Sequence, residues 1–325
     1  MFSFALNGLP DRAPERPLPA SWPPFASRWA LAALVSLLAA AAPAKAEEIM
    51  ALPSCGADDT LDRSRIVAIG GTITEILYDL GLEDDIVAVD TTSQFPPRAL
   101  EDKPDIGYMR ALSAEGVLSM SPSLLLVSEG SGPPEVLDVL EKSSVPLLYI
   151  SEEPSADGVL ERIRSLGAAM CAQEKAETLA EEVAEGFQEL DALRAEIETP
   201  KRVLFVMSMQ HGRPLVAGSE TAADAIIALA GAKNAADGLT GYKPMSEEAV
   251  VAAAPDAVLM MNRGNHQVSD ILSTPAFRLT PAGRDGELIT MDGQFLLGFG
   301  PRTPDAASTL ARMLYPELGG EEAAQ

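Results

Sequence analysis

The feature that most constrains the fold is a long helical segment in the middle of the chain. From Ala156 to Ile197 the sequence has a helical pattern, its second half is rich in Ala, Glu and Leu, and no proline follows until Pro200. The pattern predicts one long rigid α-helix with a break near Cys171–Gln173. Such a helix is a stiff connector, unlike a Gly/Ser-rich linker. We therefore expect two folded parts joined by a rigid helical segment.

Strand and helix patterns alternate on both sides of this segment. Before it, the apolar runs Arg65–Gly71, Asp85–Asp90 and Val145–Ile150 predict strands, with helical patterns between them. After it, the runs RVLFVMS, AVLMMN and GELITM predict further strands. Alternating strands and helices form mostly parallel sheets covered on both faces, which bind ligands at the carboxyl ends of their strands. The prediction is an α/β fold with an N-terminal lobe (47–155), a linking helical segment (156–199) and a C-terminal lobe (200–325).

Capping residues predict where two of the helices begin. Thr72 or Thr74 is the expected N-cap of the helix after the first strand, and Ser113 that of the short helix before the run SLLLVS. The lone Tyr108 and Arg110 lie in the loop before this short helix.

Size and composition suit two aliphatic cores and an acidic surface. The chain has 325 residues, of which 47% are hydrophobic but only 5% aromatic. Its formal net charge of −24 repels nucleic acid and anionic membrane surfaces, so neither is expected as a partner.

The N-terminus has the pattern of a secretory signal peptide over residues 1–46. Arg28 precedes an apolar run that ends in Ala44-Lys45-Ala46. A membrane anchor is the alternative, but the run is shorter than the ~20 apolar residues that a membrane span needs. We predict cleavage after Ala46. Cys55 and Cys171 are the only cysteines; in an oxidising compartment they form either a disulfide or two inert thiols.

Three stretches resemble a known family: GYMRALSAEGVLSMSPSLLLVSEG, VAGSETAADAIIALAGAKNAADGLTGYKPMSEEAV and LLGFGPRTPDAASTLARML. They resemble haem-binding periplasmic proteins of bacterial ABC importers, whose helix-linked relatives also bind siderophores and cobalamin. The resemblance runs from about Ile66 to Leu314, and GYMRALSAEG is its specific part. It implies the class III periplasmic binding protein fold. It also implies a monomer in the periplasm that delivers ferric haem (haem b) to an ABC permease dimer with its ATPase subunits in the inner membrane.

The resemblance assigns the haem iron to Tyr108. A phenolate is a hard anionic donor suited to ferric iron, and tyrosinate is an axial ligand of haem in other proteins. Arg110 is expected to meet the phenolate or a haem propionate, because a guanidinium makes bidentate contacts with such groups. The alternatives are a tyrosine ring packed on its lobe and a solvated arginine.

Two residues of the C-terminal lobe are expected to approach from the other side. His211 matches a histidine that ligates haem iron in some relatives, although the segment SMQHGRP departs from their pattern; the alternative is a solvent-facing loop histidine. Arg263 follows the strand AVLMMN and is expected to partner the tyrosinate or a propionate. His266 is a weaker candidate.

Two glutamates are expected to dock on the permease. By resemblance, Glu75 on the first helix and Glu248 at the start of MSEEAVVAA each meet a permease arginine, with Glu247 as a possible substitute for Glu248. The alternative is that both only favour helix N-termini electrostatically.

The sequence favours a binding protein over an enzyme. It has no G-x-S-x-G, H-E-x-x-H or P-loop motif, and IGGTITE lacks the spacing of a dinucleotide fingerprint. The main competing function is binding of a ferric siderophore or cobalamin in the same fold. Tyr108 discriminates between the two functions, because these ligands need no protein phenolate.

Overall fold

The structure is a computed structural model that describes Cys55 and residues 59–210, 212–262 and 271–318. These residues belong to the second of two units of the chain, Ala51–Gln325. The expected signal peptide lies outside the described residues. Within the described part of the chain, no helix has both the length and the apolar character needed to cross a membrane.

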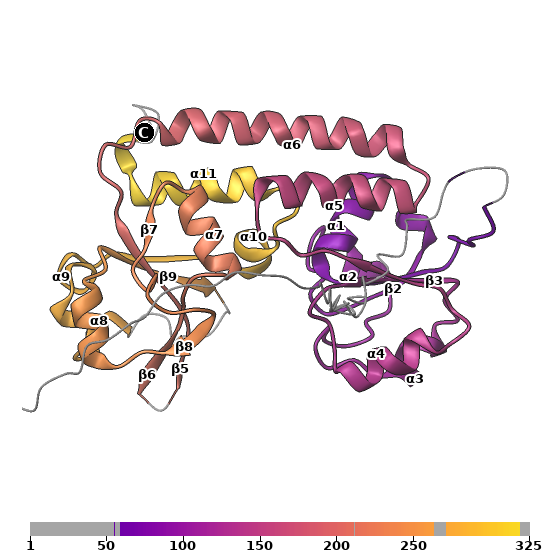
Figure 1. The fold of residues 1–325 in the computed structure, drawn as a ribbon, viewed down its shortest axis with the longest axis horizontal. Helices are drawn as coiled ribbons and strands as arrows, with labels where there is room; N and C mark the ends of the chain where they lie inside the picture. The colour runs from indigo at the N-terminus through magenta and orange to yellow at the C-terminus, as the bar shows by residue number, and fades with distance from the viewer. Residues whose placement is uncertain (1–54, 56–58, 211, 263–270, 319–325) are drawn as a thin grey trace, which may run out of the picture. The chain divides into compact units, whose positions relative to one another are not determined.

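The first lobe is built on a four-stranded parallel sheet with the strand order β2-β1-β3-β4 (Figure 1). Its strands are β1 (Ile66–Ile69), β2 (Ile86–Val89), β3 (Leu124–Ser128) and β4 (Leu147–Ile150). Its helices are α1 (Gly71–Asp79), η1 (Glu83–Asp85), α2 (Arg98–Asp102), α3 (Ala114–Ser119) and α4 (Pro134–Glu141).

Both faces of this sheet are buried, as the continuous apolar strands predicted. Side chains alternate between the faces of a strand, so Ile66 and Ala68 of β1 pack into a core with α1 and α5. Val67 and Ile69 pack on the other face, in a cluster that includes Val117 of α3 and a residue of α4. Because helices cover both faces, the loops of this lobe lie at the ends of the strands.

The linking segment differs from a single helix. It consists of α5 (Ala156–Ala169) and α6 (Gln173–Arg194), which pack against each other, and α6 also packs on α11 (Figure 1). The break falls where it was predicted: Cys171 has a φ of 55°, a left-handed conformation that a continuous helix cannot contain. The rigid connector is thus a helical pair whose longer member is α6.

The second lobe contains a six-stranded mixed sheet in the order β10-β9-β5-β6-β8, with β7 paired to β5. Its strands are β5 (Arg202–Gln210), β6 (Arg213–Ala217), β7 (Lys233–Asn234), β8 (Tyr242–Pro244), β9 (Ala257–Asn262) and β10 (Leu288–Asp292). Its helices are α7 (Ala222–Leu229), α8 (Glu247–Ala253), η3 (Ile271–Ser273), η4 (Phe277–Leu279), α9 (Pro281–Asp285), α10 (Gly293–Leu297) and α11 (Thr303–Leu314).

Part of this second sheet was not predicted. β9 and β10 run parallel to β5 as expected, but β6 and β8 add an antiparallel meander at the other edge. The predicted α/β architecture of two sheets flanked by helices is nevertheless confirmed.

One predicted helix cap is confirmed and the other is wrong. Ser113 caps α3, accepting a hydrogen bond from Gly116 N. α1 instead begins after Gly70, which has a φ of 123° and no side-chain cap. Thr72 and Thr74 lie inside α1 with buried side chains. A Cβ on Gly70 would lie 2.7 Å from Cβ of Ser128, so this turn requires glycine.

Candidate functional site

Tyr108 is exposed on a loop between α2 and α3. Its side chain is 46% exposed, and Arg110 is exposed as well. Two apolar residues of the loop are anchored: Met109 and Leu112 are buried in the cluster between the first sheet and helices α3 and α4. The loop thus holds its apolar residues in the core and presents a phenol and a guanidinium to solvent.

Hydrogen bonds fix the backbone of this loop on both sides of Tyr108. Thr91 N donates to Gly107 O at 3.0 Å, and Ala111 N donates to Tyr108 O at 2.7 Å. Met109 N donates to a carboxylate oxygen of Asp90 at 3.3 Å. Among the described residues, none forms a hydrogen bond with the phenol oxygen of Tyr108. The tyrosine is therefore held by its backbone while its phenol is available to a ligand.

Tyr242 of the second lobe is within electrostatic range of Arg110. It lies on β8 and is 38% exposed. Partial burial raises the pKa of Tyr242, and the positive charge of Arg110 offsets part of that rise. Arg110 belongs to the first lobe and β8 to the second, so the charge of Arg110 acts across the two lobes. Sequence reasoning missed Tyr242 because β8 has no strand signal of its own.

His211 and Arg263 lie outside the described residues, as does His266. β5 ends at Gln210, the residue before His211, and β9 ends at Asn262, the residue before Arg263.

Glu75 has a role different from the one expected. It is 2% exposed, and its carboxylate accepts two hydrogen bonds from Arg302, at 2.9 Å from Nε and 2.8 Å from Nη2. The Arg302 guanidinium stacks on Phe95 at 3.5 Å from the ring centroid. This ion pair joins α1 of the first lobe to the residue before α11. The placement contradicts permease docking by Glu75, because a buried and fully paired carboxylate has no room for a partner's arginine.

Further contacts link the lobes around this pair. Thr72 Oγ1 donates to Gly298 O at 2.6 Å, and Gln94 N donates to Gln294 Oε1 at 3.1 Å. Arg162, which is 3% exposed, donates to Phe299 O. The segment from α10 to α11 is therefore fastened to the first lobe at several points.

Glu248, by contrast, is exposed at the start of α8. Hydrogen bonds from its own backbone N–H and from Ser246 lower its pKa, with a smaller contribution from the charge of Arg213. Glu247 beside it is also exposed. Both carboxylates are therefore open to a partner.

A repeated motif identifies the residue that matches Glu248 in the first lobe. SAEGVLSMSP from Ser113 and SEEAVVAAAP from Ser246 share Ser, Glu, Val and Pro at the same spacing. In each, the serine caps the helix, accepting from the backbone N–H three residues later at 3.3 and 3.2 Å. The position of Glu248 is taken by Glu115, which is exposed.

The repeat extends to the ends of the two helices. Ser121 and Ala254, at the same place in the motif, have φ values of 51° and 44° and precede prolines that lead into β3 and β9. Glu115 and Glu248 are therefore structurally equivalent. Comparing the two halves of the sequence would have revealed this motif.

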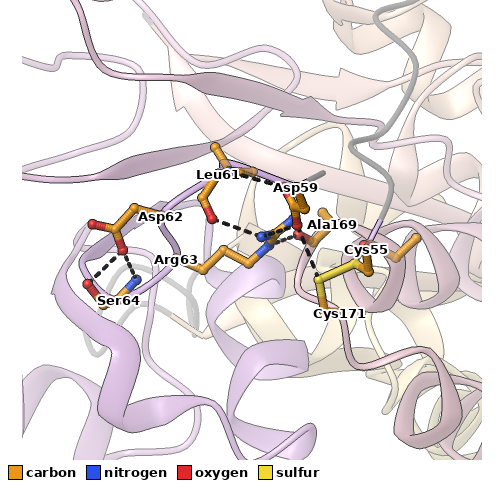
Figure 2. Close-up of polar contacts among 9 residues, drawn as sticks. Cys55, Asp59, Leu61, Asp62, Arg63, Ser64, Ala169 and Cys171 are labelled. Carbon is orange, nitrogen blue, oxygen red and sulfur yellow. Dashed lines mark hydrogen bonds and ion pairs between the residues drawn. A yellow bond between two sulfur atoms is a disulfide. The ribbon is translucent and has the colours of Figure 1, made fainter. Parts of the chain in front are cut away.

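Cys55 and Cys171 form a disulfide with their Cα atoms 5.4 Å apart. Arg63 reinforces the attachment: it donates to Ala169 O and pairs with Asp59 at 2.7 Å (Figure 2). Cys55, Asp59 and Cys171 are also close enough to be considered as metal ligands. Metals bind thiolates, which these two cysteines lack because they form a disulfide. The group therefore attaches the N-terminal segment to the end of α5.

Two α/β lobes joined by a long helical segment are the architecture of class III periplasmic binding proteins. The chain belongs to the periplasmic binding protein family, which matches residues 66–295. Its structure is similar to that of a periplasmic heme-binding protein, BhuT, in complex with two hemes. The TM-score is 0.74 and the sequence identity 39%, over 78% of this chain and 98% of BhuT.

Two other relatives bear on the ligand. The heme-binding protein RhuT from Roseiflexus sp. RS-1, in its apo form, has a TM-score of 0.75 and 38% identity over 79% of this chain and 100% of RhuT. A vitamin B12-binding protein from Pectobacterium atrosepticum is 25% identical over 77% of this chain and 88% of its own length. These relatives are binding proteins, as the sequence predicted.

Proposed function

We propose that this protein is the periplasmic haem-binding component of a bacterial ABC importer, with Tyr108 as the axial ligand of ferric haem. The observation that carries the proposal is the exposed phenol of Tyr108 on a loop with a fixed backbone, two residues from the exposed Arg110. A phenol ionises only near pH 10 in water. Ferric iron and a nearby guanidinium both favour the phenolate, so this loop suits a haem iron.

The remaining contacts to haem are proposed from both lobes. Arg110 pairs with a propionate or with the phenolate itself. Tyr242, whose ionisation responds to the charge of Arg110, offers the ligand an aromatic face and a hydroxyl from the second lobe. His211 and Arg263 remain proposals from the sequence: a second axial ligand and a partner for the tyrosinate. The similarity to BhuT and RhuT, each described as heme-binding, supports haem as the ligand.

Docking on the permease is proposed for Glu115 and Glu248. Both are exposed first-turn residues of Ser-capped helices that occupy the same place in the two halves of the chain. A permease dimer with arginines related by two-fold symmetry would meet one carboxylate from each lobe. The chain is proposed to act as a monomer, without catalytic activity, after removal of residues 1–46 on export to the periplasm.

A second candidate is binding of cobalamin, which the similarity to vitamin B12-binding proteins favours. The two functions are separated by titrating the purified mature protein with hemin, and in parallel with cyanocobalamin, while absorption is recorded. Haem binding predicts a saturable spectral change with hemin only. Saturation by cyanocobalamin without a response to hemin would replace the proposed function with the second candidate.

A further inference from the structure

We propose that Asp90 is a positioning residue that holds Tyr108 in the orientation needed to bind haem iron; this inference rests on the proposed function. Asp90 directly follows β2 and is 0% exposed. Its carboxylate contacts the Tyr108 loop at the backbone N–H of Met109.

The carboxylate of Asp90 gathers donors from three loops at the carboxyl edge of the first sheet. Gly70 N, in the β1–α1 turn, donates to Oδ1 at 2.9 Å. Thr92 donates from its N–H at 3.0 Å and from its hydroxyl at 2.8 Å, both to Oδ2, and Ser93 Oγ donates to Oδ1 at 3.3 Å. Met109 N donates to Oδ2 at 3.3 Å.

Burial of this carboxylate is costly unless it is fully hydrogen-bonded. Among the described residues, no cation pairs with Asp90; its partners are backbone N–H groups and hydroxyls. A neutral apolar side chain could fill the same space in a sheet edge that needed only packing. Five donors converge on this carboxyl group, so it ties the loops that it binds to the end of β2.

The contact with Met109 N acts directly on Tyr108. That N–H and the carbonyl of Tyr108 belong to one peptide group, and the carbonyl accepts from Ala111 N at 2.7 Å. Because both polar ends of this rigid peptide group are bonded, its plane is fixed. The preceding peptide group is held through Gly107 O, which accepts from Thr91 N at 3.0 Å. Fixing both planes fixes the direction in which the Tyr108 side chain leaves the backbone.

The test is a double-mutant cycle of Asp90→Asn and Tyr108→Phe, read by hemin affinity and by the tyrosinate-to-iron charge-transfer band. Asp90→Asn keeps the shape but places an amide where only acceptors fit. In the wild-type background it should weaken hemin binding about tenfold and shift the band. In the Tyr108→Phe background it should change affinity by less than about twofold, because the group through which it acts is gone. Equal losses in both backgrounds would overturn the proposal.

A matched control and a second variant keep this test sharp. Asn234→Ala removes a buried polar side chain with similar backbone contacts in the second lobe; it should lower the melting temperature and leave the band in place. Thr92→Val retains the carboxylate but removes the hydroxyl bonded to both its oxygens. If Asp90→Asn does not fold, Thr92→Val should show a smaller loss with the same dependence on Tyr108, and an additive loss would overturn the proposal.

Hydrogen exchange of the haem-free protein tests positioning independently of the proposed function. Asp90→Asn should speed exchange in the segment 105–112 about tenfold, whereas Asn234→Ala should not. Unchanged exchange in this segment would refute the role of Asp90 even if hemin binds. Failure of the wild-type protein to bind hemin, together with faster exchange in Asp90→Asn, would refute the proposed function but leave the loop assignment standing.

Discussion

Removing the carboxylate of Glu75 should destabilise the protein without affecting delivery of its ligand. Glu75 is 2% exposed, and the Arg302 side chain that it pairs with is 26% exposed. Breaking a buried pair by deleting one partner costs about 3–5 kcal/mol, because a charge is left buried without compensation. Partial exposure of Arg302 and its stacking on Phe95 reduce this cost. We expect about 3 kcal/mol for Glu75→Ala.

Thermal unfolding measures this loss. At about 2 °C per kcal/mol for a chain of this size, the melting temperature of Glu75→Ala should fall by about 6 °C. Glu248→Ala is the matched control: its side chain is exposed, so its free energy of unfolding should change by less than about 0.5 kcal/mol. Arg302→Ala combined with Glu75→Ala should cost less than the sum of the single variants. A Glu75→Ala protein that melts like the wild type but fails to activate a transporter would refute the burial argument and restore the docking role.

Three further predictions address other parts of the molecule. Asp79 is exposed at the end of α1, but partial desolvation raises its pKa to about 6, helped by the charge of Glu75. Stability should therefore fall as pH rises from about 4 to 6. Asp79→Asn should raise the melting temperature at pH 7 but not at pH 4, and an equal gain at both pH values would contradict this. Replacing Cys55 and Cys171 by Ser should lower the free energy of unfolding by about 2–5 kcal/mol with hemin affinity unchanged; a melting temperature insensitive to reductant would argue against the disulfide. Glu115→Ala with Glu248→Ala should bind hemin and melt normally, yet fail to stimulate ATPase activity of the permease in reconstituted vesicles, and normal stimulation would exclude this docking pair.

The sequence predicted the architecture where a helix or strand depends mainly on its own neighbouring residues. Buried parallel strands read as continuous apolar runs, and a Ser before a helical pattern predicts a cap, as at Ser113. The short strands β6 and β8 were not predicted, because they pair with distant parts of the chain and contain polar residues and proline. The prediction that Thr72 or Thr74 caps α1 was wrong because their hydroxyls form tertiary hydrogen bonds, Thr72 with Gly298 O and Thr74 with Ser93.

In the candidate site, too, residues in a local motif could be predicted and residues that depend on distant contacts could not. Tyr108 and Arg110 could be selected from a short motif, and the structure exposes both. The burial of Glu75 could not be read from the sequence, because its partner Arg302 lies in the other lobe. Asp90 gave no signal either, since its role depends on three loops that meet only in the folded chain.

The most direct test of the account is the absorption spectrum of the ferric haem complex of the wild-type protein beside that of Tyr108→Phe. The account predicts a tyrosinate-to-iron charge-transfer band in the wild type. In Tyr108→Phe, which keeps the ring but lacks the oxygen donor, the band should be absent and hemin binding weaker. An identical spectrum and affinity in the two proteins would contradict ligation by Tyr108.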